Sequence, residues 1–303
     1  MTRSATPVLS PWQLHDFADE GFLVLPQICS AIEVAWLHAA LIELFRRRAG
    51  RTEGRQFDML GLDTDADQPR QPQILEPSVL VPELLRTAYF QRVATAARQL
   101  LGRDAQFSFD HAILKPAGSA AATPWHQDEI HQTQRYLRHR QVSFWLALQH
   151  TSMLNGCMRY VPRSNHWPLL PHQPLNGDAR LHALECVPGS FDESLAVEVP
   201  VHAGSCIAHG SRTLHAALPN FSAQDRIAYI LAFIGPPLPG RRQRVAITAG
   251  ETANRRRHQR WLLRGGFLVA IARRLARFGN IQPRLVWLKL RTLVRATVGL
   301  TEE

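Results

Sequence analysis

The chain has 303 residues, of which 45% are hydrophobic and 20% are charged, and its formal net charge is +10. A chain of this length can bury a sizeable core and holds one large domain or two small ones. No run approaches the roughly 18 consecutive apolar residues of a membrane-spanning helix, so we expect no such helix.

The cysteines and the first residues indicate a reducing compartment. Residues 1–12 contain no apolar run that could serve as a signal peptide. No two cysteines form a Cys-x-x-Cys pair, so neither a zinc knuckle nor a redox motif is expected. They are Cys29, Cys157, Cys186 and Cys206. We therefore expect a cytoplasmic protein with reduced cysteines.

The positive charge is concentrated at the C-terminal end. Residues 241–303 contain 15 Lys or Arg against 3 Asp or Glu, which gives +12. The first 240 residues contain the other 20 basic and 22 acidic side chains, which gives −2. We predict two parts, a folded domain over residues 1–240 and a basic segment over residues 241–303.

Two helices and a short strand are predicted near the N-terminus. Ser10 is a suitable N-cap, followed by a proline at the first helical position, and Gly21 ends this helix. Residues 22–25 are apolar and predict a short buried strand. Apolar residues at helical spacing over residues 30–48 then predict a long amphipathic helix.

The next region predicts a loop, a helix and a strand. Residues 49–75 are polar and rich in Gly, Asp and Gln, so we expect a loop that covers the site. Residues 82–101 have a helical pattern that Gly102 ends. Residues 106–116 alternate as a strand, and residues 118–122 are small and connect it to the following segment.

Short apolar runs dominate the rest of the folded part. Residues 142–150, 206–209 and 228–233 predict buried strands, whereas residues 129–141 and 169–194 predict polar loops beside the cavity. Several short strands separated by turns favour a sandwich or jelly roll over βαβ units. The residues alone therefore predict a mainly β fold with flanking helices.

One short motif suggests a metal site. In Trp125-His126-Gln127-Asp128, a strand would direct His126 and Asp128 to the same side. Non-haem iron(II) is bound by two such histidines and one carboxylate on one face of an octahedron. A lone His-x-Asp is weak evidence, because roughly one chain in two of this composition contains one by chance. A second histidine has to come from far along the chain.

Several further segments, together with this motif, resemble the phytanoyl-CoA dioxygenase family. Residues 17–26 resemble the family's opening helix and first strand, and residues 124–128 its first iron motif. Residues 145–166 resemble its central strands and Pro-Gly-Ser-His turn, although Arg163 and Asn165 depart from that turn. Of the nearby His202, His209 and His215, only His215 is followed by a Pro-Asn turn and by Arg226 eleven residues later, so the resemblance implies His215 and Arg226 as the distal pair.

The resemblance implies a fold and a chemistry. The fold is a double-stranded β-helix, a cupin-like jelly roll, with helices packed outside it. The implied cofactors are Fe(II), held by His126, Asp128 and His215, together with 2-oxoglutarate as co-substrate and O2. The implied reaction hydroxylates an unactivated C–H bond and converts 2-oxoglutarate to succinate and CO2. Because the carboxylate of Asp128 is present, hydroxylation is favoured over halogenation.

Three more residues are candidates for binding the co-substrate. Arg226 is expected to bind the distal carboxylate of 2-oxoglutarate, since a guanidinium is always charged and two-pronged. Trp145 and Lys115 are weaker candidates, for which a core tryptophan and a solvated lysine are the alternatives. Ala217 lies where a hydroxyl contact to the co-substrate is sometimes found in the family.

Two other functions are alternatives to an oxygenase. A non-catalytic jelly roll that binds a metal or a ligand is the main alternative, and the complete set of iron ligands argues against it. A zinc hydrolase would also use histidine and carboxylate ligands, but no His-Glu-x-x-His sequence is present. The expected substrate is a small or lipid-linked molecule.

The basic segment predicts amphipathic helices with aromatic residues. Arginines and lysines alternate there with apolar residues over residues 255–298. Such helices can lie in the surface of an anionic membrane, which would place the protein at the inner face of the membrane. Packing on the catalytic domain or dimer formation is the alternative, and no nucleic-acid partner is expected. The sequence does not predict the oligomeric state.

Overall fold

The computed structural model describes residues 8–62, 68–132 and 138–238. The basic segment predicted over residues 241–303, including residues 255–298, lies outside these described residues. The structure therefore provides no test of the predicted division into two parts. Within the described ranges, no helix is long and apolar enough to cross a bilayer.

The first two helices begin as predicted, with reciprocal side-chain caps. In α1 (Pro11–Glu20), the Ser10 hydroxyl accepts from the Gln13 amide at 3.2 Å, and the Gln13 side chain accepts from the Ser10 amide at 2.9 Å. Ser30 and Glu33 repeat this arrangement at the start of α2 (Ala31–Arg46). Each capping box satisfies backbone donors that a helix end leaves free. Gly21, at φ 85°, ends α1 as expected.

The prediction of a single helix over residues 82–101 is wrong. A 3-10 turn, η1 (Pro82–Arg86), is followed by Thr87, which caps a separate helix, α4 (Ala88–Leu101). The Thr87 hydroxyl accepts from a backbone amide of α4 at 3.1 Å. Its own backbone is extended, at ψ 154°, and so interrupts the helical path. A short helix, α3 (Pro77–Leu80), precedes the turn.

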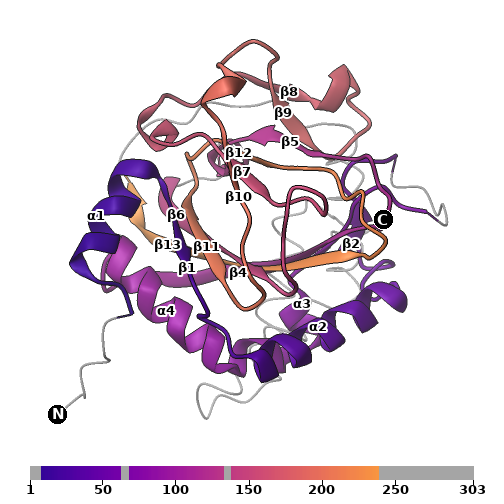
Figure 1. The fold of residues 1–303 in the computed structure, drawn as a ribbon, viewed down its shortest axis with the longest axis horizontal. Coiled ribbons are helices and arrows are strands. Elements are labelled where there is room, and N and C mark those ends of the chain that lie inside the picture. Colours follow the sequence, from indigo (N-terminus) through magenta and orange to yellow (C-terminus); the bar gives the residue numbers. More distant parts are fainter. Residues whose placement is uncertain (1–7, 63–67, 133–137, 239–303) are drawn as a thin grey trace, which may run out of the picture.

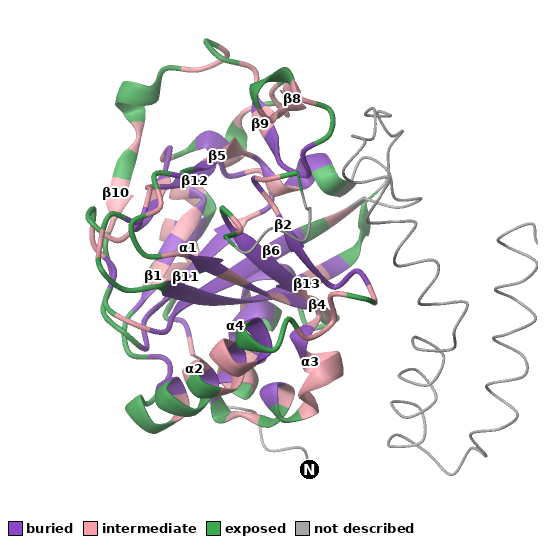
Figure 2. Cartoon of the chain, turned by 90° about the vertical axis from the view of Figure 1, so that its right-hand side faces the viewer, coloured by how far each residue is buried: buried purple, intermediate pink, exposed green. Residues whose placement is uncertain are grey.

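A seven-stranded antiparallel sheet forms the base of the fold. Its strands run in the order β1-β11-β6-β13-β4-β3-β2. Helices α2, α3 and α4 lie along one face (Figure 2), where Leu37, Leu41, Tyr89 and Val93 are fully buried. In chain order the strands are β1 (Phe22–Leu25), β2 (Gln56–Asp58), β3 (Pro72–Leu75), β4 (Gln106–Lys115), β6 (Arg138–Ala147), β11 (Cys206–Gly210) and β13 (Arg226–Leu238).

A four-stranded sheet faces the other side of this base (Figures 1 and 2). It has the order β10-β7-β12-β5, and a second apolar core that includes Trp145, Tyr160 and Ile230 fills part of the space between the sheets. Two antiparallel sheets that face each other across this second core confirm the predicted jelly roll. The strands are β5 (Thr123–His126), β7 (Met158–Tyr160), β10 (Val197–Val199) and β12 (His215–Ala217).

Three segments predicted as loops contain strands. Residues 49–75 provide β2 and β3, and residues 169–194 provide the hairpin of β8 (His172–Pro174) and β9 (Leu184–Cys186). The segment 129–141 contains part of η2 (Asp128–Gln132) and the start of β6. Strands β2, β3, β8 and β9 have three or four residues each, which is too short for an alternating pattern to show. The remaining 3-10 turns are η3 (Ser164–His166), η4 (Leu175–Gly177) and η5 (Glu193–Leu195).

Candidate metal centre and anion site

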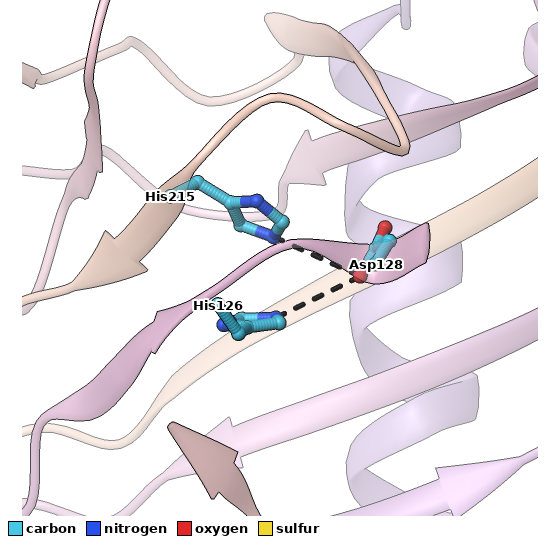
Figure 3. A group of neighbouring side chains, drawn as sticks. All are labelled: His126, Asp128 and His215. Carbon is cyan, nitrogen blue, oxygen red and sulfur yellow. Dashed lines mark ion pairs between the residues drawn. The ribbon is translucent and has the colours of Figure 1, made fainter. Parts of the chain in front are cut away.

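Neighbouring strands of the small sheet bring two distant histidines together. His215 of β12 and His126 of β5 are direct partners in the antiparallel register, and their ring centroids are 4.2 Å apart. Asp128 follows β5 at the start of η2, and its carboxylate points towards both rings (Figure 3). Potential ligand atoms of the three side chains all lie within 4.8 Å of one another, so together they could hold a metal ion.

Both imidazoles present the same nitrogen to the carboxylate. The Asp128 Oδ1 atom lies 3.7 Å from His126 Nε2 and 3.9 Å from His215 Nε2. The Nδ1 atoms lie 2.8 Å and 2.9 Å from the carbonyl oxygens of Pro124 and Thr213. A carbonyl can only accept, so each Nδ1 carries the proton and each Nε2 keeps a free lone pair. Metal-binding histidines are commonly held in this way.

The site favours the protonation states that bind a cation. Burial raises the pKa of Asp128, but a hydrogen bond from His209 and the nearby histidines lower it well below its usual value. Burial and the neighbouring histidines lower the pKa of His215 well below its usual value, and burial also lowers that of His126. The carboxylate is therefore ionised and both imidazoles are neutral at neutral pH, as metal coordination requires.

The other two candidates for the distal histidine are not part of this group of three. His202 is exposed and its ring faces that of His150 at 5.0 Å. His209 lies on β11 of the large sheet, with its Nε2 atom 3.6 Å from Asp128 Oδ2. His209 thus approaches the opposite oxygen of the carboxylate, a contact that the sequence pattern did not predict.

The three side chains line one cavity of about 680 Å³ between the two sheets. Its wall combines aromatic, amide and imidazole side chains, with Arg55 and Glu76 paired at one place on it. Besides the triad, this wall includes Phe57, Met59, Gln73, Ser108, Phe109, His111, Thr123, His131, Gln141, Ser143, Trp145, Met158, His182, His209, Ala217, Arg226 and Ile230.

Arg226 supplies a buried positive charge in the same cavity. It is the first residue of β13, it is only 2% exposed, and its Cζ atom lies 5.1 Å from the centre of the Trp145 ring. Burial lowers its pKa to about 10, so the guanidinium stays protonated at neutral pH. Its Nε and Nη1 atoms have no hydrogen-bond partner in the part of the chain that the structure describes. A buried cation without partners is costly, so this group suits a bound anion.

Lys115 is the partner of Arg226 in the register of the large sheet, and its side chain donates hydrogen bonds to neighbouring residues. Its Nζ donates to Gln71 Oε1 and to the Ala121 carbonyl, each at 3.0 Å. Burial and the charge of Arg226 lower its pKa well below the usual value. Lys115 is not among the described residues that line the cavity. Its predicted contact with a co-substrate stays a prediction.

Thr123 is a further polar residue that the sequence did not single out. It is the partner of Ala217 in the register of the small sheet, and it lines the cavity. Its hydroxyl donates to Gln71 Oε1 at 3.0 Å, the same atom that Lys115 contacts. A hydroxyl is therefore present directly across the strand pair from Ala217, the position of the hydroxyl that is sometimes found in the family.

The donor set fits a divalent transition metal. Two neutral imidazoles and one carboxylate form the facial arrangement that leaves the remaining positions of an octahedral ion open. The free N–H groups of Arg226 fit an acid group in the same cavity. The site can therefore hold a metal ion beside an anionic molecule.

Comparison with known proteins places this chain in a family. The family model of phytanoyl-CoA dioxygenase (PhyH) matches residues 17–228. Ectoine dioxygenase of Streptomyces avermitilis is 28% identical over 155 residues, which is 50% of this chain and 50% of that protein. Phytanoyl-CoA dioxygenase of Arabidopsis thaliana is 24% identical over 256 residues, which is 75% of this chain and 89% of that protein. The chain thus spans about half the length of the ectoine dioxygenase.

Solved structures agree with these matches. EvdO2 of Micromonospora carbonacea, in complex with 2-oxoglutarate, is 32% identical with a TM-score of 0.65, over 77% of this chain and 93% of that chain. EctD of S. alaskensis, with 2-oxoglutarate and 5-hydroxyectoine, is 24% identical with a TM-score of 0.60, over 81% of this chain and 88% of that chain. The second likeness supports the fold alone. By its family match and its likeness to EvdO2, this chain belongs to the phytanoyl-CoA dioxygenase family.

Proposed function

We propose that this chain is an Fe(II)- and 2-oxoglutarate-dependent dioxygenase that hydroxylates a small molecule. His126, Asp128 and His215 hold the iron, and Arg226 binds the distal carboxylate of 2-oxoglutarate. One observation carries the proposal. A complete N2O1 donor set and a buried arginine with free N–H groups line the same cavity. A likeness to EvdO2, whose structure contains 2-oxoglutarate, supports the choice of co-substrate.

Iron in such a site, together with 2-oxoglutarate and O2, supplies the oxidising power that inserts oxygen into a C–H bond. One oxygen atom enters the substrate as a hydroxyl group, and the other enters succinate as CO2 is released. The protein's part is to hold these reactants in place and to keep water away from them.

Arg226 and Trp145 form the co-substrate end of the cavity in this proposal. The guanidinium donates hydrogen bonds to the distal carboxylate and neutralises its charge. The Trp145 ring lies against the guanidinium at 5.1 Å and is only 3% exposed, so it excludes water from this ion pair. Thr123 offers a hydroxyl on the cavity wall. This arrangement orients the opposite, keto-acid end of 2-oxoglutarate towards the metal.

The rest of the cavity is available to the substrate. Its volume, about 680 Å³, lies in the range of small-molecule sites, roughly 300–1,000 Å³. The positive charge of Arg55 is matched by Glu76, and the neighbouring Phe57, Phe109 and Gln73 are uncharged. A small molecule that combines apolar surface with uncharged polar groups fits this lining.

A lipid-linked substrate remains a narrower form of the proposal. It depends on the segment 255–298, which would bring the catalytic domain to an anionic membrane at the inner face. Flotation with liposomes that contain anionic lipid tests this idea, with a chain that lacks residues 255–303 as the comparison. Equal flotation of the two chains would remove the membrane proposal and leave the oxygenase proposal intact.

Succinate formation tests the proposed function. The purified protein, supplied with Fe(II), 2-oxoglutarate and O2, should form succinate, and a metabolite panel should reveal compounds that accelerate it. Asp128→Ala should form almost none. Equal rates in the two proteins would refute the ligand assignment. Metal binding without any succinate would favour the alternative, a non-catalytic metal- or ligand-binding jelly roll.

A further inference from the structure

The two carboxylate oxygens of Asp128 face different surroundings. Oδ1 lies between His126 Nε2, at 3.7 Å, and His215 Nε2, at 3.9 Å. Oδ2 accepts a hydrogen bond from Ser143 Oγ at 3.0 Å and lies 3.6 Å from His209 Nε2. One oxygen therefore faces the two proposed histidine ligands, whereas the other faces the large sheet.

Ser143 and His209 reach Asp128 as a pair. Ser143 lies on β6 and His209 on β11, and the two are direct partners in the antiparallel register. Both are 3% exposed, and both line the cavity. Cross-strand partners have Cβ atoms about 4.5–5.5 Å apart, which is close enough for both side chains to meet one oxygen atom.

Tyr160 fixes the orientation of His209. The Tyr160 hydroxyl lies 3.1 Å from His209 Nδ1, and the Tyr160 ring is fully buried and stacked on Phe22 at 4.6 Å. When this hydroxyl donates to Nδ1, the ring proton of a neutral His209 lies on Nε2, the nitrogen that faces Asp128. Tyr160, on β7 of the small sheet, therefore links the opposite sheet to the same carboxylate.

The second oxygen matters because an octahedral ion has only six positions. Two histidines and one carboxylate oxygen would occupy three, a chelating keto acid would occupy two, and one position would remain for O2. A carboxylate that bound through both oxygens would take that last position. The hydrogen bond from Ser143 Oγ and the approach of His209 Nε2, at 3.6 Å, hold the outer oxygen on the side of the large sheet and so oppose this.

We propose that Ser143 and His209, supported by Tyr160, are positioning residues that keep Asp128 a ligand through one oxygen only. This inference rests on the proposed function, because it assigns Asp128 to the metal. It predicts that the pair controls how tightly the metal and 2-oxoglutarate bind, and neither residue needs to touch the substrate. Partners that orient a metal ligand typically change metal affinity 10- to 100-fold.

Co(II) binding tests the proposal without catalysis. Co(II) is added to the metal-free full chain, and the visible absorption spectrum and the Co(II) affinity are measured, followed by a titration with 2-oxoglutarate. Ser143→Ala and His209→Ala should each still bind Co(II), with roughly 10- to 100-fold lower affinity and an altered spectrum. The Co(II) forms of both should also bind 2-oxoglutarate more weakly. Ser143→Thr, which keeps the hydroxyl, should restore all three properties.

A matched control and two further outcomes decide the result. His202→Ala removes an exposed histidine outside the cavity wall and should leave Co(II) binding unchanged. Wild-type spectra and affinities in both Ser143→Ala and His209→Ala would overturn the proposal. Should one variant fail to fold by circular dichroism, the other decides. A separate result, wild-type Co(II) binding by Asp128→Ala, would refute the ligand assignment itself.

Discussion

Replacing Arg226 with methionine should separate co-substrate binding from stability. The change keeps an unbranched side chain but removes the guanidinium, two of whose nitrogens have no partner among the described residues. A hydrogen bond to a charged group contributes about 1.5–3 kcal/mol, so losing two should weaken 2-oxoglutarate binding on the order of 100-fold or more. Because the cation is unmatched until an anion binds, its removal should cost the unliganded protein little.

The expected change in stability follows from two opposing terms. Removing an unsatisfied buried group relieves about 1–3 kcal/mol. Losing the contact with Trp145, at 5.1 Å, costs about 0.5–2 kcal/mol. The free energy of unfolding of unliganded Arg226→Met should therefore lie between about 1 kcal/mol below and about 2.5 kcal/mol above the wild-type value. A paired structural arginine would behave differently, since its loss strands a buried acid and costs about 3–5 kcal/mol.

Thermal unfolding with and without ligand measures both effects. At 100 times its dissociation constant, 2-oxoglutarate should stabilise the Mn(II)-loaded wild type by about 2.7 kcal/mol, or roughly 5–10 °C. Arg226→Met should show no such shift at that concentration. Arg159→Met is a matched control, because Arg159 lies over the Trp125 ring at the same 5.1 Å and pairs with Glu198. It should keep the ligand shift. A strongly destabilised Arg226→Met that still binds 2-oxoglutarate would refute the reasoning.

Three further changes have distinct expected outcomes. Burial lowers the pKa of His172 to about 4, so the free energy of unfolding should fall as the pH drops from about 6.5 towards 4. In urea titrations at pH 7, 6 and 5, His172→Gln should reduce this dependence of the unfolding free energy on pH. Gly156 has φ 86°, and Gly156→Ala would also place a Cβ atom 2.6 Å from a backbone carbonyl oxygen. Gly189→Ala adds only the cost of its φ of 78°, about 1–2 kcal/mol, so Gly156→Ala should lower the midpoint of urea unfolding more. Equal midpoints for the two variants would contradict this. Loss of a contact that supports a metal ligand costs up to roughly 100-fold in affinity, and His215→Ala should reduce Co(II) affinity by more than this. His202→Ala should leave the Co(II) affinity unchanged. Similar losses in the two variants would contradict the choice of distal histidine.

Local signals predicted the parts of the fold that local contacts stabilise. The cap at Ser10 is formed with a residue three positions away, so the local sequence contains all the needed information. The ten residues of β4 are long enough to show alternation. Strands β2 and β3 have three and four residues and exist because β3 pairs along the edge of β4 and β2 pairs with β3. A window of sequence does not contain that partner, and the segment was therefore predicted as a loop.

The site depends on cross-strand pairs in the same way. His126 and His215 meet because β5 and β12 are in register, and Ser143 meets His209 because β6 and β11 are. A slip of one residue in either pair of strands would turn the side chains to the opposite face. The motif around His126 could be read from the sequence, whereas the contact of Ser143 with Asp128 had no local signal at all.

The turn between β12 and β13 shows how sequence spacing and register are connected. Asn220 is fully buried, and its side-chain amide donates to the Lys115 carbonyl at 3.0 Å and to the Gln224 carbonyl at 2.8 Å. The first bond ties the turn to the end of β4, beside the point where Arg226 enters β13. The turn therefore fixes the path of the chain from His215 to Arg226. The eleven-residue separation visible in the sequence follows from that path, because a shorter or longer turn would move the guanidinium out of register with the metal site.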